Sequence, residues 1–131
     1  MKKGMKGRRS ERCTARPGTG RLVAGVARDP VRAGVLAQVL RALGHPARLR
    51  ILAHLLGAEE RTVNDIAGAL GLPQAVASQH LGALRLYGLV RVRRDGGFRH
   101  YAVALPMVAE LVACMARCYE LHGSKLPQNA A

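Results

Sequence analysis

Aromatic residues, acidic residues and long apolar runs are all scarce in this chain of 131 residues. It contains no Trp, one Phe and three Tyr, so its hydrophobic core has to be aliphatic. No run approaches the ~18 consecutive apolar residues of a membrane-spanning helix. The composition also excludes a collagen, a disulfide scaffold and a coiled-coil rod. The length predicts a single domain, and the 49% of apolar residues suffice for a core.

Cysteines are too few, and odd in number, to form a disulfide framework. Cys13, Cys114 and Cys118 are therefore expected to be thiols in a reducing compartment. The apolar segment Leu22–Ala27 is too short and too late for an export signal. These features predict a cytoplasmic protein, associated with the nucleoid of a bacterium, with no membrane partner.

Basic residues outnumber acidic ones by 21 to 8, which gives a net charge of +13. Such a charge attracts polyanions, of which nucleic acid and anionic membranes are the candidates. Residues 1–28 hold nine of the Lys and Arg residues but one acid, Glu11, with several Gly and Pro17. This composition predicts a flexible basic arm with at most a short helical turn near Leu22–Val26. The arm is either a solvated tail or an aid to DNA binding through phosphate contacts.

Apolar residues recur at helical spacing in four segments after residue 28. Each segment starts at a capping residue or a Pro and stops at or beside a Gly, as helices commonly do. The four predicted helices are bounded by Asp29-Pro30 and Gly44, by His45-Pro46 and Gly57, by Thr62 and Gly71, and by Pro73 and Tyr87-Gly88.

The period of the apolar residues then changes from 3.6 to 2. Two alternating segments, Leu89–Arg94 and Phe98–Val103, flank Asp95-Gly96-Gly97, which is a strong signal for a β-hairpin. A last helix is predicted from Pro106 to about His122. The expected fold class is mainly α with a small β-hairpin wing (α+β), a winged helix-turn-helix. Its domain covers residues 29–123, between an arm at 1–28 and a frayed tail at 124–131.

The segment Val63–Leu84 fits the helix-turn-helix pattern, with Ala67 where the helices cross and Gly71 in the tight turn. The early turns of the second helix enter the major groove, where Gln pairs with adenine and Ser with several bases. We expect His80 to seat this helix, Arg85 to contact a phosphate, and the wing arginines to reach the backbone or minor groove. The alternative is an ordinary helical hairpin with a solvated arginine face. The candidate DNA-binding residues are Gln74, Ala75, Ser78, Gln79, His80, Arg85, Arg91, Arg93, Arg94 and Arg99.

From about Leu40 to His122 the chain resembles the ArsR/SmtB family of repressors. The similarity lies in Leu43–Leu52, Ile66–Leu72, Ser78–Leu81, Leu84-Arg85, Gly88–Val90 and the wing. The resemblance implies a homodimer that represses transcription at an inverted repeat in double-stranded DNA and releases it when a ligand binds. It also implies a helical dimer interface built from the first and last helices. The last helix is indeed apolar on two sides, as a helix with two partners should be.

The sequence departs from three sensor sites of that family. Thr62–Asp65 stands where a cysteine pair binds arsenic or cadmium. Leu105–Met107 replaces the Asp-x-His motif that begins a zinc site. Ala53 aligns with the cysteine of members that form a di- or tetrasulfide. The resemblance therefore does not identify the inducer.

Three potential ligands remain in the last helix, because Cys114, Cys118 and His122 recur every four residues and share one face. Two thiolates can hold a soft ion, and an imidazole can complete the set. Arsenite or mercuric ion would suit sulfur, while zinc, nickel or cobalt would suit sulfur with nitrogen. Cys13 is a candidate third thiolate. The alternatives are thiol redox sensing and plain packing of the two cysteines, with His122 interacting with the helix dipole.

Nothing in the sequence indicates an enzyme, since Gly-rich phosphate loops, paired carboxylates and nucleophile motifs are missing. The sequence favours a specific, homodimeric DNA-binding repressor that a soft metal or metalloid ion releases, with no cofactor required for DNA binding. A redox-sensing or ligand-insensitive repressor of the same fold is the first alternative. A non-specific architectural DNA-binding protein, dominated by the basic arm and strongly salt-sensitive, is the second.

Overall fold

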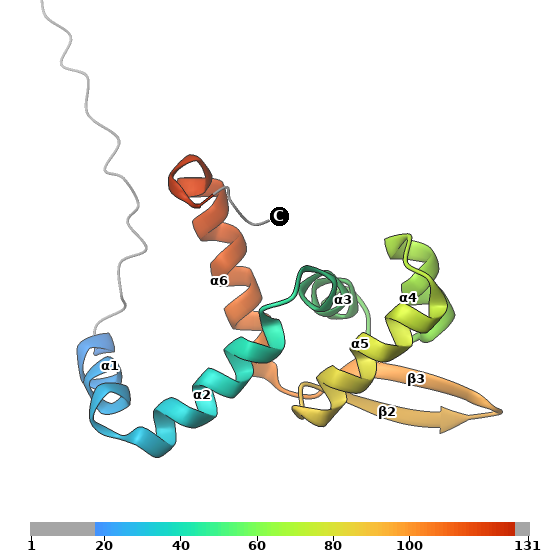
Figure 1. Ribbon diagram of the computed structural model, residues 1–131, viewed down its shortest axis with the longest axis horizontal. Coiled ribbons are helices and arrows are strands. Elements are labelled where there is room, and N and C mark those ends of the chain that lie inside the picture. Colours follow the sequence, from blue (N-terminus) through green and yellow to red (C-terminus); the bar gives the residue numbers. More distant parts are fainter. Residues whose placement is uncertain (1–17, 128–131) are drawn as a thin grey trace, which may run out of the picture. The chain divides into compact units, whose positions relative to one another are not determined.

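The computed structural model describes residues 18–127 (Figure 1). The chain divides into two compact units, Met1–Ala33 and Gly34–Ala131, which are described separately below. Within residues 18–127, none of the helices has the length and apolar character needed to cross a membrane.

The described part of the first unit contains helix α1 (Thr19–Arg28) and the first turn of α2 (Pro30–Leu43). Helix α1 is longer than the short turn expected within the basic arm, so the last ten residues of that arm have regular structure. Ala is a strong helix former, and the apolar residues at 22, 23 and 26 lie on one side of the helix. Residues 1–17, the rest of the predicted arm, lie outside the described residues.

Asp29 ends α1 in an extended conformation, as a residue before proline prefers, and caps α2 as predicted. Its Oδ1 accepts hydrogen bonds from the backbone amides of Val31 and Arg32, at 3.0 and 3.2 Å. The sequence signal for the start of this helix is therefore confirmed.

The second unit contains the rest of α2 and four further helices, α3 (Pro46–Leu56), α4 (Val63–Leu70), α5 (Gln74–Leu86) and α6 (Pro106–His122). The predicted caps are present: His45 Nδ1 accepts from the Ala47 amide at 3.1 Å, and Thr62 and Asp65 form a reciprocal capping box. A 3-10 turn, η1 (Gly123–Lys125), follows α6, so the segment expected to fray begins with regular structure. Residues 128–131 lie outside the described part.

Three strands form an antiparallel sheet in the order β1-β3-β2. Strands β2 (Val90–Asp95) and β3 (Phe98–Val103) are the predicted hairpin, and the two glycines of its turn have φ angles of 55° and 84°. These positive angles match a tight hairpin turn. Strand β1 (Arg61–Thr62) pairs with β3 just before α4. It was not expected, because two residues are too few to show an alternating pattern.

The core is aliphatic, as predicted, and contains one nearly buried aromatic side chain, Tyr101, which is 4% exposed. The fully buried large side chains come from α3, α4, α5, α6 and the residue just before β2: Ile51, Leu52, Leu55, Ile66, Leu81, Leu84, Leu89 and Val108. Some apolar side chains are exposed. They include Val31, Val35 and Leu40 on α2 and Met107, Met115, Tyr119 and Leu121 on α6.

Candidate nucleic-acid interface

Helix α5 buries one face and presents polar side chains on the other. Ala77, Leu81 and Leu84 are fully buried against the core. The predicted base-reading residues, Gln74, Ala75, Ser78 and Gln79, are exposed on the first two turns, and Arg85 is exposed near the other end of the helix. Because its first turns are exposed and polar, α5 has the character of a recognition helix.

The turn between α4 and α5 is held at its α4 end by several hydrogen bonds. Gly71 adopts a left-handed conformation with φ of 65°, and the Leu72 amide donates to the Ala67 carbonyl at 2.9 Å. From α3, the guanidinium Nη2 of Arg50 donates to the carbonyl of Leu70 at 3.0 Å. The C-terminus of α4 is therefore held by its own turn and by a neighbouring helix. Ala67 is buried, as its predicted place at the helix crossing requires.

His80 lies on α5 but is turned toward α3 rather than outward. Its ring centroid is 4.4 Å from that of His45. Burial lowers the pKa of His80, and the nearby His45 and Arg48 lower it further. These contacts favour the seating role expected for His80 over direct base contact.

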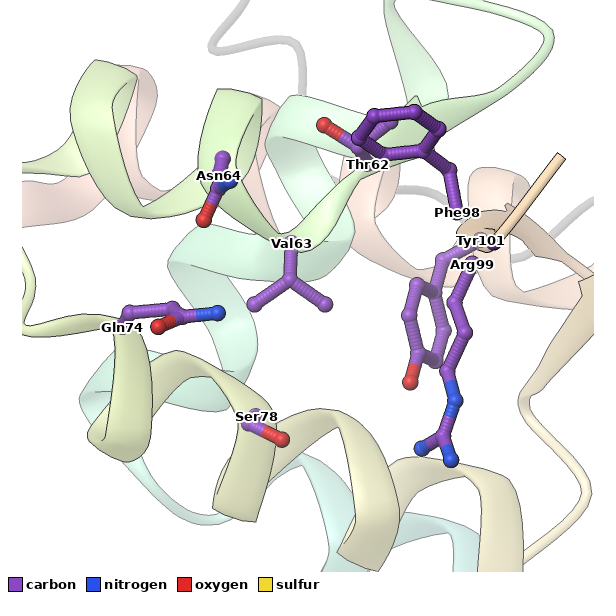
Figure 2. A pocket seen from close by; sticks show the side chains of 9 residues that line it. Thr62, Val63, Asn64, Gln74, Ser78, Phe98, Arg99 and Tyr101 are labelled. Atoms are coloured by element: carbon purple, nitrogen blue, oxygen red, sulfur yellow. The ribbon is translucent and has the colours of Figure 1, made fainter.

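The wing arginines divide between the two faces of the hairpin. Arg94 pairs across the strands with Arg99, and Arg93 pairs with His100. Because successive residues of a strand point to opposite faces, Arg94 and Arg99 share the face of Tyr101. Figure 2 shows the side chains of Arg99 and Tyr101 extending toward α5. Arg91 and Arg93 belong to the opposite face, away from the recognition helix.

Arg93 is engaged by two carboxylates. Its guanidinium contacts Glu60 through Nη2 at 2.8 Å and Nε at 3.1 Å, and contacts Asp95 through Nη1 at 3.1 Å. These hydrogen bonds raise the pKa of Arg93, and the bond from Arg93 lowers the pKa of Glu60. Sequence reasoning missed the pairing, because Glu60 lies 33 residues away.

A cleft of about 370 Å³ lies between the N-terminal ends of α4 and α5 and the wing. It is lined by Thr62, Val63 and Asn64 at the start of α4, by Gln74 and Ser78 of α5, and by Gly97, Phe98, Arg99 and Tyr101 of the wing (Figure 2). The sequence predicted Gln74, Ser78 and Arg99 as DNA contacts, and the structure brings these three together. The sequence did not predict Asn64 or Tyr101 at this surface.

The predicted metal ligands lie on α6, away from this cleft. Cys114 and Cys118 are half-buried thiols, and His122 is the half-buried last residue of the helix. Among residues 18–127, no three His, Cys, Asp or Glu side chains are grouped closely enough to hold a metal ion. Cys13 lies outside the described residues.

An exposed polar recognition helix beside an arginine-bearing hairpin defines a winged helix-turn-helix regulator. Residues 43–93 match the family described as "Helix-turn-helix domain". An uncharacterized helix-turn-helix transcriptional regulator of Mycobacterium tuberculosis is 44% identical over 78 residues, which are 59% of this chain and 68% of that protein. The chain belongs to the ArsR/SmtB family of winged helix-turn-helix transcriptional repressors. Its class is that of a transcription regulator and not of an enzyme.

Two further relatives carry more specific names. The probable mercury resistance operon repressor of Streptomyces lividans is 42% identical over 63% of this chain and 64% of its own length. The transcriptional repressor BigR of Xylella fastidiosa has a crystal structure that matches with a TM-score of 0.61 and 32% identity, covering 69% of this chain and 88% of that one.

Proposed function

We propose that this chain is a homodimeric repressor that binds an inverted-repeat operator in double-stranded DNA. The observation that carries the proposal is the position of Gln74 and Ser78, exposed on α5 beside Arg99 of the wing. Gln and Ser can read base edges in the major groove, and Arg can hold the adjacent backbone or minor groove. Relatives named as repressors support the same function.

The apolar side chains exposed on α2 and α6 support the homodimer. Val35 and Leu40 of α2 are 58% and 56% exposed, and Tyr119 and Leu121 of α6 are 59% and 51% exposed. Apolar faces of this kind mark interaction surfaces, and a symmetric dimer covers the same face on each copy. Two α5 helices about 34 Å apart would then enter successive major grooves.

We place the inducer at α6, as a soft metal or metalloid ion held by the thiolates of Cys114 and Cys118. Side chains four residues apart lie one turn apart on a helix, and α6 belongs to the proposed dimer surface. The name of the Streptomyces lividans relative supports a thiophilic ion such as mercuric ion. Because residues 18–127 offer no group of three donors, a further donor would come from Cys13 or from a second chain. Arsenite would suit sulfur alone, and zinc, nickel or cobalt would add His122.

The test is fluorescence anisotropy of the full chain on a duplex that the protein itself selects from a random-sequence pool. Excess unrelated DNA is present at about 0.15 M salt, where screening is close to physiological. Mercuric ion, arsenite, zinc, nickel, cobalt and an oxidant are titrated in turn. We expect one thiophilic ion to release the DNA. By linkage, that ion then binds the free protein more tightly than the complex.

Matched variants of α6 separate sensing from packing. Cys114→Ser with Cys118→Ser should bind the duplex and no longer respond to the ion, whereas Ala116→Ser on the same helix should respond normally. Release by the oxidant alone would favour redox sensing, and no release at all would mean a ligand-insensitive repressor. If unrelated DNA competes as well as the selected duplex, the protein is an architectural binder instead.

A further inference from the structure

We propose that the cleft between α4, α5 and the wing binds a single phosphate of the DNA backbone, with the hydroxyl of Tyr101 as a positioning donor. This inference rests on the proposed DNA binding and assigns Tyr101 and the first amides of α4 to it. Three independent features of the cleft support an anion there.

The first feature is a pair of backbone amides at the start of α4. A helix begins with four amides that have no partner within the helix. The capping box satisfies two of them, because Asp65 N donates to Thr62 Oγ1 and Thr62 N donates to Asp65 Oδ2, each at 3.2 Å. The amides of Val63 and Asn64 remain, and both residues line the cleft. Amides at a helix start, reinforced by the helix dipole, form a ready site for a phosphate oxygen.

The second feature is the phenol of Tyr101. The side chain is 4% exposed, and its ring belongs to the hydrophobic core. Its hydroxyl extends into the cleft toward α5 (Figure 2), and the hydrogen bonds among residues 18–127 include none from it. The hydroxyl is not among the buried polar atoms without a partner in residues 18–127, so it opens onto the cleft and can reach a group bound there. A phosphate oxygen in the cleft would accept a hydrogen bond from it.

The third feature is the charge of the lining. Of the nine residues that line the cleft, only Arg99 is charged. The carboxylate of Asp65 is held against the Thr62 amide, and these bonds lower its pKa. An anion in the cleft therefore meets a guanidinium and neutral donors.

The position of the cleft identifies the anion as part of the duplex. Gln74 and Ser78 line the cleft and also belong to the exposed polar face of α5. A phosphate bound there is adjacent to the bases that these side chains would read. Phosphate contacts of this kind fix the register of a protein on DNA.

The experiment uses the selected duplex with a neutral methylphosphonate placed at each backbone position in turn. We expect one position in each half-site to lower the affinity of the native chain about tenfold, the size of a hydrogen bond to a charged group. Tyr101→Phe keeps the ring and should bind unmodified DNA about tenfold more weakly. At that one position, the methylphosphonate should lower the affinity of this variant clearly less than it lowers the affinity of the native chain. Tyr87→Phe, at the C-cap of α5 and outside the cleft, should match the native chain.

The salt dependence of binding distinguishes the contribution of Arg99 from that of Tyr101. Arg99→Gln should lower the slope of log affinity against log salt by about 1 for each protomer. Tyr101→Phe should leave the slope unchanged, because a hydroxyl carries no charge. Thermal unfolding of each variant, measured in parallel, confirms that it folds.

One result would overturn the inference: a folded Tyr101→Phe variant with native affinity and a native methylphosphonate profile. Inhibition of DNA binding by inorganic phosphate beyond that of chloride at equal ionic strength, lost in Tyr101→Phe, would support a phosphate site that the DNA occupies. Failure of the proposed function looks different, since the native chain would then prefer no sequence. Tyr101→Phe could still be compared with the native chain by their affinities for a mixed-sequence duplex.

Discussion

The imidazole of His80 on α5 packs against that of His45 at the start of α3, with their planes inclined by 41°. His45 also caps α3, because its Nδ1 accepts a hydrogen bond from the Ala47 amide. Burial lowers the pKa of His80 from 6.5, and the charges of His45 and Arg48 lower it further. The contact therefore joins the recognition helix to the start of α3.

Acidification should weaken this contact and destabilise the protein. The pKa of His80 is depressed in the folded state, so the unfolded chain takes up the proton first. The contribution of His80 to the free energy of unfolding is constant above the unfolded pKa of about 6.5. It becomes unfavourable as the pH falls below that value. Thermal unfolding between about pH 7.5 and pH 5.5 should show a smaller loss of stability for His80→Gln than for the native chain. His122→Gln is the control, and equal profiles for the native chain and His80→Gln would contradict the prediction.

Two glycines of the helix-turn-helix should respond oppositely to alanine. Gly71 has φ of 65°, whereas Gly68 is helical, and a Cβ atom added there would meet nothing within 4 Å. Gly71→Ala should lower the free energy of unfolding by about 1 kcal/mol, because a Cβ disfavours the left-handed region. Gly68→Ala should raise it by up to about 1 kcal/mol through helix propensity. Chemical denaturation measures both, and a shift of the same sign in the two variants would refute the argument.

Among the wing arginines, Arg99 should matter more for DNA binding than Arg93. The charge of Arg93 is already balanced by Glu60 and Asp95, whereas Arg99 lines the cleft beside α5. Arg99→Gln should therefore weaken binding at low salt several-fold more than Arg93→Gln. Anisotropy titrations at several salt concentrations provide the comparison. The pairing itself is solvent-exposed, so Glu60→Gln should leave the free energy of unfolding nearly unchanged.

A charge placed on the exposed face of α2 should separate the proposed dimer. Val35 is 58% exposed in the single chain, and Val35→Glu would bury a carboxylate between two copies. Analytical ultracentrifugation should show the native chain as a dimer and this variant as a monomer, with weaker binding to the inverted repeat. Leu86→Glu, at a position 86% exposed on α5, should remain a dimer. A dimeric Val35→Glu variant would place the interface elsewhere.

Local signals in the sequence predicted most of the elements. The Asp29 cap, the Thr62–Asp65 capping box and the turn at Gly71 each act within a few residues. Their effect can therefore be read without tertiary information. The hairpin was predicted for the same reason, because its alternating segments flank a glycine turn.

Features that depend on distant residues escaped prediction. Strand β1 exists only because β3 pairs with it, and Arg93 is neutralised by Glu60 from another part of the chain. The alternating pattern of residues 98–103 predicts a strand and nothing more for Tyr101, although the cleft gives its hydroxyl a place at the candidate interface. The division of the wing arginines between the two faces of the hairpin also depends on distant residues, because it follows from the strand register and from the face that packs against α5.

Strand β1 has a consequence for the length of DNA that the proposed dimer can recognise. Thr62 caps α4 and pairs with His100 of the wing, so one residue joins the helix-turn-helix to the hairpin. On the proposed operator, a base pair inserted within a half-site would shift the wing contacts out of phase with those of α5. Each half-site should therefore keep a constant length, whichever bases it contains.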